Sequence, residues 1–106
     1  MAAQTLKDKV VLITGGAKNL GGLISRKFAE QGAKLAIHYN SESSKADAEK
    51  TLAEVKALGI DAILLQADLS SIDRIEELFV KTKQHFGGID IAINTVGRVL
   101  KKPIVD

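Results

Sequence analysis

The residues best suited to chemistry form a glycine-rich turn, Thr14-Gly15-Gly16-Ala17-Lys18-Asn19-Leu20-Gly21-Gly22. The turn lies between a short apolar run and a segment with helical spacing. A helix that begins there presents unpaired backbone N–H groups and the positive end of its dipole, which together attract a diphosphate. Gly15 would allow the tight turn, and Gly21 would allow close approach of helix and strand. Glycines that serve loop geometry alone are the alternative, but the position between a strand and a helix favours phosphate binding.

A second group of polar residues, His38-Tyr39-Asn40-Ser41, follows the second apolar run. In NAD-binding units, an acidic residue about 20 positions beyond the glycines accepts hydrogen bonds from the ribose 2′-hydroxyl. No carboxylate occupies this region, and Asn40 and Ser41 can donate to a 2′-phosphate. Lys18 could reach the same phosphate, although by itself it is equally consistent with a solvated surface lysine. Together with the missing acid, Lys18 predicts NADP(H) in preference to NAD(H), with Tyr39, Asn40 and Ser41 in contact with it.

Two further polar segments follow the third and fourth apolar runs, Ala67-Asp68-Leu69 and Asn94-Thr95-Val96-Gly97. Asp68 could serve a ligand at this edge, or it could cap the following helix together with Ser70. Asn94 followed three residues later by Gly97 is, taken alone, only a turn signal. However, these segments and the glycine turn follow separate strands, and the carboxyl ends of the strands are the edge where open α/β sheets bind ligands.

The elements that must position these residues alternate between two hydrophobic periods. We expect strands at 10–14, 34–38, 61–67 and 89–94, and helices at 20–31, 42–58 and from Ser70 or Ser71 to residue 86. Short connections and right-handed crossovers then predict an α/β fold, a partial Rossmann-type doubly wound parallel sheet with strand order 3-2-1-4. Apolar residues recur at helical spacing in the first helix and are expected to point inward in the third: Leu20, Leu23, Ile24 and Phe28 in the first, and Ile72, Ile75, Leu78, Phe79 and Phe86 in the third.

The composition excludes several classes of function. The 106 residues suffice for a single domain, and the 45% hydrophobic and 26% charged content is ordinary for a globular protein. A net charge of +2 gives no reason to expect nucleic-acid binding. Without cysteine there is no thiol nucleophile or thiolate metal site, and His38 has no partner at metal-ligand spacing, so we assign no metal. No signal peptide or membrane span is evident, so a cytoplasmic location is expected.

Three of these segments jointly resemble the short-chain dehydrogenases/reductases, over residues 8 to about 103. The Thr-Gly-x-x-x-(Gly)-x-Gly spacing, the Asp68-Leu69 pair beside the adenine, and the Asn94-to-Gly97 turn, which closes over the ribose and locks the sheet, correspond to family signatures. Asn19 stands where the family usually has Gly, and Val96 where it has Ala. Asn is the best replacement for Gly at positive φ, and its amide could also donate to a phosphate.

The resemblance implies hydride transfer between a nicotinamide and a small carbonyl or alcohol substrate. The family uses a Ser and a Tyr with a Lys four residues later, and these belong to the second half of its fold. The single tyrosine of this chain, Tyr39, is followed four residues later by Ser43, so we assign no catalytic residues. Residues 1–106 are therefore expected to form one truncated cofactor-binding domain, and the full-length form a homo-oligomer. The fourth strand would then be an unpaired apolar edge.

Two other functions remain open at this point. The first is a dinucleotide-binding module or truncated product without turnover. The second is a methyltransferase of related topology, which would place an acid after the second strand to hold the cofactor ribose. The absence of that acid between Tyr39 and Ser41 argues against the methyltransferase.

Overall fold

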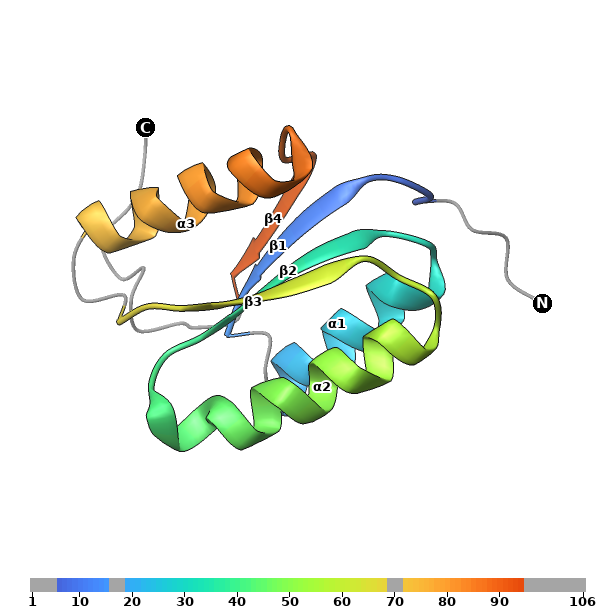
Figure 1. The fold of residues 1–106 in the computed structure, drawn as a ribbon, viewed down its shortest axis with the longest axis horizontal. Coiled ribbons are helices and arrows are strands. Elements are labelled where there is room, and N and C mark those ends of the chain that lie inside the picture. The colour runs from blue at the N-terminus through green and yellow to red at the C-terminus, as the bar shows by residue number, and fades with distance from the viewer. Residues whose placement is uncertain (1–5, 16–18, 69–71, 95–106) are drawn as a thin grey trace.

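A computed structural model describes residues 6–15, 19–68 and 72–94 of the chain. Its four strands are all parallel and lie in the order β3-β2-β1-β4, which confirms the predicted topology. Helices α1 and α2 cover one face of the sheet and α3 covers the other (Figure 1). The elements follow in the order β1 (Val10–Thr14), α1 (Asn19–Glu30), β2 (Lys34–Tyr39), the 3-10 turn η1 (Glu42–Ser44), α2 (Lys45–Ala57), β3 (Ala62–Gln66), α3 (Ile72–Phe86) and β4 (Ile91–Asn94).

The core lies around β1 and β2, at the middle of the sheet. Their consecutive apolar residues are buried because helices cover both faces, as expected for parallel strands. Alternate residues of the two strands enter different layers. The layer with Ala29 of α1 and Val55 of α2 contains Val11, Ile13, Leu35 and Ile37, and the layer with Leu78 of α3 contains Leu12, Ala36 and Ala67.

The face that α1 turns to the sheet differs from the apolar spacing in the sequence. Its buried stripe consists of the small residues Gly21, Ser25 and Ala29, four positions apart, and Gly22 beside the first of them is buried too. Ile24 and Phe28 flank this stripe and pack against the core, whereas Leu20 and Leu23 are 62% and 45% exposed. A stripe of small side chains allows the helix axis to lie close to the strands, which leaves the large leucines outside.

The predicted inward face of α3 is also partly wrong. Leu78 is buried, and Ile75 and Phe86 are partly buried against it, but Ile72 and Phe79 are 71% and 38% exposed. The buried stripe is centred on Leu78 and Thr82, whose hydroxyl is satisfied because it donates to the Leu78 carbonyl at 2.7 Å. Because the polar Thr82 belongs to the buried stripe, the face of α3 that contacts the sheet is rotated by part of a turn from the face that the apolar residues alone predict.

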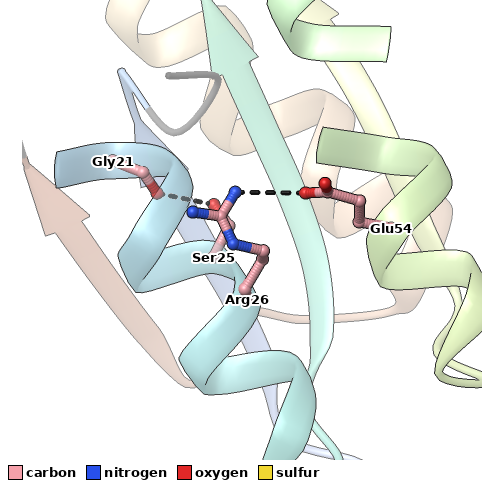
Figure 2. Close-up of polar contacts among 4 residues, drawn as sticks. All are labelled: Gly21, Ser25, Arg26 and Glu54. Atoms are coloured by element: carbon pink, nitrogen blue, oxygen red, sulfur yellow. Dashed lines mark hydrogen bonds and ion pairs between the residues drawn. The ribbon is translucent and has the colours of Figure 1, made fainter. Parts of the chain in front are cut away.

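Two polar contacts around α1 are drawn in Figure 2. The buried Ser25 hydroxyl donates to the Gly21 carbonyl one turn earlier, at 2.9 Å. Arg26 forms an ion pair with Glu54 of α2 at 3.1 Å, with both side chains about 40% exposed. Exposed pairs contribute about 0–1 kcal/mol, so apolar packing rather than this ion pair must hold the two helices together.

Candidate functional site

The described candidate residues gather at one edge of the sheet, where its parallel strands end. Gly15 directly follows β1, Asn40 and Ser41 follow Tyr39 at the end of β2, and α1 begins at Asn19. Asp68 follows β3 by two residues, and Asn94 is the last residue of β4. The predicted positions Lys18, Leu69 and Gly97 lie outside the described residues, as do the proposed capping residues Ser70 and Ser71. The fold thus brings the described candidates to a common edge, as the segment order predicts.

The glycine turn opens with a backbone conformation that only glycine adopts without strain. Gly15 has a φ of 72°, in the left-handed region. Its N–H donates to His38 Nδ1 at 2.9 Å. Leu20, in the first turn of α1, is largely exposed, whereas Gly21 is buried. The N–H groups of this first turn have no carbonyl partner within the helix, which is the arrangement that an anion requires.

His38 is the residue at this edge to which the sequence assigned no role. Its side chain is fully buried, and its Nε2 lies 2.7 Å from the Ala67 carbonyl oxygen. A backbone N–H can only donate, so Nδ1 facing Gly15 must be unprotonated, and Nε2 must carry the proton that it donates to Ala67. The neutral ring therefore connects the turn after β1 with the end of β3. The sequence does contain a signal for this role: His38 lies in an aliphatic strand that is buried on both faces. Both nitrogens of a buried histidine ring need hydrogen-bond partners.

Burial of His38 predicts an acid-sensitive fold. Burial lowers the pKa of His38 below its ordinary value of 6.5, and the hydrogen bond to Ala67 only partly offsets this. At His38 the unfolded chain therefore binds more protons than the folded chain between the folded-state pKa and about pH 6.5. The His38 contribution to the free energy of unfolding is complete above that pH and falls as the pH drops toward the folded-state pKa. Urea unfolding at pH 7.5, 6.5 and 5.5 should show this decline in wild type and a smaller one in His38→Asn, and parallel declines would contradict it.

The end of β2 and the loop that follows it are held through their backbone, by Gln66 at the end of β3 and by Ala67 directly after it. Gln66 Nε2 donates to the Asn40 carbonyl at 2.6 Å, and the Ala67 N–H donates to the Tyr39 carbonyl at 3.1 Å. The hydroxyls of Ser41 and Ser43 lie 2.9 Å apart. Asn40 is exposed and Ser41 is half-buried, so the side chains of both can present hydrogen-bond donors at the surface of a loop whose backbone is held in place. Sequence reasoning missed Gln66, because a polar residue at the exposed end of a strand carries no distinctive signal.

The end of β4 is joined to the end of β1 by side chains. The Thr14 hydroxyl lies 2.8 Å from Asn94 Oδ1 and 3.3 Å from the Ile93 carbonyl, so it can donate to either. At the other end of the same strand pair, Asp90 Oδ2 accepts from the Val10 N–H at 2.8 Å. Asn94 therefore connects the edge strand to the central strand, consistent with the sheet-locking part of its predicted role. Asp68 is exposed at the end of β3, where its carboxylate is accessible.

Among the residues that the structure describes, no group of three or more histidine, cysteine, aspartate or glutamate side chains could hold a metal ion. No helix within them is long and apolar enough to cross a membrane.

Comparison with known proteins identifies the family. The short chain dehydrogenase family matches residues 9–106. A hydroxynaphthalene reductase of Aspergillus fumigatus is 35% identical over 99 residues, which are 93% of this chain and 36% of the reductase. This chain thus spans little more than a third of that relative.

Solved structures agree with this match. A Burkholderia cenocepacia protein described as a dehydrogenase and crystallised with bound NADP is 60% identical, with a TM-score of 0.82 over 89% of this chain and 36% of its own. A short-chain dehydrogenase of Oenococcus oeni is 44% identical, with a TM-score of 0.84 over 95% of this chain and 45% of its own. The sheet order, the glycine turn and these matches lead to one conclusion: the chain belongs to the short-chain dehydrogenase family.

Proposed function

We propose that this chain is the NADP(H)-binding part of an oxidoreductase that acts on a small carbonyl or alcohol substrate. The observation that carries the proposal is the edge at which a positive-φ glycine, a helix N-terminus and an uncharged polar loop after β2 come together. The NADP held by the 60% identical Burkholderia protein supports the cofactor assignment. When bound, the nicotinamide would donate or accept the hydride.

The residues of this edge fit the parts of a dinucleotide. The turn that Gly15 opens would bring the backbone N–H groups of Leu20 and Gly21, with Asn19 and Lys18, to the diphosphate. Tyr39, Asn40 and Ser41 would border the adenosine ribose, and the absence of a carboxylate there suits a 2′-phosphate. The remaining assignments are Asp68 and Leu69 for the adenine and Asn94 and Gly97 for the ribose.

No residue of this chain is assigned a catalytic role. Its single tyrosine, Tyr39, lies on the adenosine side of the proposed site and is followed at the fourth position by Ser43 instead of lysine. The work that we assign to these residues is to bind and orient the nucleotide. The substrate, the cytoplasmic location, the homo-oligomeric state and the assignment of residues 1–106 to one domain remain predictions.

Nucleotide titration of the intact protein tests the proposal. Isothermal titration with NADPH, NADH and S-adenosylmethionine should show tightest binding of NADPH, because Asn40 and Ser41 donate to its extra phosphate. Negligible affinity for both nicotinamide nucleotides in folded protein would contradict the proposed function. Because residues 1–106 carry no assigned catalytic residue, turnover must be tested in a longer form that contains the second half of the fold. Binding without NADPH consumption across a panel of aldehydes and ketones in that form would favour the module without turnover.

Gln66 provides a selective test of the loop after β2. Gln66→Leu removes the hydrogen bond to the Asn40 carbonyl, and a bond of this kind is worth about 0.5–1.5 kcal/mol. We expect NADPH affinity to fall by about 2- to 12-fold and NADH affinity to change little, since only NADPH carries the phosphate that this loop faces. The exposed Gln84 of α3 supplies the control, Gln84→Leu, which should leave both dissociation constants unchanged. Equal losses for the two nucleotides would show that Gln66 does not act through the 2′-phosphate.

A further inference from the structure

We propose that His38 is a positioning residue for the diphosphate: its unprotonated Nδ1 holds the first glycine of the turn in the conformation that the nucleotide requires. The inference rests on the proposed function, because it needs a nucleotide at this edge. It assigns His38 a task that is separate from contact with the nucleotide.

The bond from Gly15 to His38 lies where the strand ladder stops. The pairing of β1 with β2 ends at Ile13↔Ile37, one residue before His38. Beyond that point the imidazole continues the connection, since the Gly15 N–H donates to its Nδ1 at 2.9 Å. The ring therefore ties the start of the turn to β2 at the position where the regular backbone pairing between these strands has ended.

The other side of the ring is anchored to Ala67, the residue directly after β3. The pairing of β2 with β3 continues to Tyr39↔Gln66, and the Ala67 N–H donates to the Tyr39 carbonyl at 3.1 Å. The carbonyl of the same Ala67 accepts from His38 Nε2 at 2.7 Å. With its partner held by backbone bonds, the fully buried ring has little freedom to rotate.

Such an anchor matters because the residue that it holds is a glycine. Gly15 adopts a φ of 72°, but glycine populates many other conformations at little cost. A fixed hydrogen bond selects one conformation before the nucleotide arrives, which lowers the entropy lost on binding. The effect should be equal for NADPH and NADH, because both carry the diphosphate.

Three substitutions separate the two bonds. His38→Asn retains an oxygen near the place of Nδ1 that can accept from Gly15, whereas His38→Gln retains an amide nitrogen near the place of Nε2 that can donate to Ala67. His38→Leu removes both. We expect His38→Asn to bind NADPH and NADH within about threefold of wild type, and His38→Gln and His38→Leu to bind both about tenfold more weakly, as for a lost hydrogen bond.

Two measurements without nucleotide accompany the titrations. The ¹⁵N shifts of His38 should show the Nε2–H tautomer in the wild-type protein. Hydrogen exchange of the Gly15 amide should be faster in His38→Gln than in His38→Asn. The thermal midpoints of both variants should fall by similar amounts, because each loses one bond, so stability alone would not produce the expected difference in affinity.

The possible outcomes discriminate between the inference and the proposed function. If the wild-type protein binds nucleotide, and His38→Asn and His38→Gln bind it with equal affinity, the role of His38 is overturned and the cofactor site is left intact. An Nδ1–H tautomer in wild type would overturn it without any variant. Wild-type protein that is folded, with the expected tautomer, but binds neither nucleotide would instead overturn the proposed function, and the inference with it.

Discussion

Gly15→Val should weaken NADPH binding by roughly 10- to 100-fold, whereas Gly59→Val should leave it unchanged although both variants are strained. Gly15 has a φ of 72° and Gly59 a φ of 84°, and the left-handed conformation costs an ordinary L-residue about 1–2 kcal/mol. Relief of that strain at Gly15 would move its N–H away from His38 Nδ1 and displace donors to the diphosphate. Loss of one charge-assisted hydrogen bond, at about 1.5–3 kcal/mol, accounts for the expected change in affinity.

Gly59 is a suitable control because it lies after α2, at the amino end of β3. A Cβ added at Gly59 meets no heavy atom within 4 Å, so the cost there is backbone strain alone. Both variants should lose about 1–2 kcal/mol of unfolding free energy, or more for a β-branched side chain, measured by urea denaturation. Isothermal titration then separates stability from affinity. Unchanged NADPH affinity in folded Gly15→Val would refute the assignment of the glycine turn to the diphosphate.

Asn40→Asp should reverse the cofactor preference. Asn40 is exposed and its backbone carbonyl is held by Gln66, so the substitution changes charge with little change in shape. Two unit charges about 4 Å apart repel by about 1 kcal/mol in bulk water and about 4 kcal/mol near a protein surface. NADPH affinity should therefore fall by roughly 10- to 10³-fold, while NADH, whose ribose hydroxyl can donate to the new carboxylate, should bind equally well or better.

The control for Asn40→Asp is Gln84→Glu, the same change of charge on the exposed surface of α3. It should alter neither dissociation constant. The penalty in Asn40→Asp should also shrink between 0.05 M and 0.5 M salt, because repulsion between exposed charges is screened. A parallel response of NADPH and NADH to the substitution would place the 2′-phosphate away from Asn40 and remove the argument for NADP(H) preference.

The sequence alone determined the class of fold and the edge of the sheet where the candidate residues lie. Uninterrupted apolar runs such as Val10–Thr14 indicate strands buried on both faces, and their alternation with helical segments leaves few topologies for a parallel sheet. Once the strands are parallel, residues that follow different strands, such as Gly15 and Asp68, must share one edge. These inferences needed only local periodicity and chain order, which the sequence states directly.

The tertiary structure decided which side chains hold that edge together and which helix faces are buried. Gly15 and His38 are 23 positions apart, Asn40 and Gln66 are 26, and Thr14 and Asn94 are 80. Each pairing depends on the register between strands that are distant in the chain, and periodicity along one strand does not specify that register. For the same reason the exposed Leu20 could not be foreseen, because the small-residue stripe of α1 has meaning only against the sheet that it contacts. A hydrogen bond needs its two atoms within about 3 Å, and only the assembled sheet brings such distant residues to that distance.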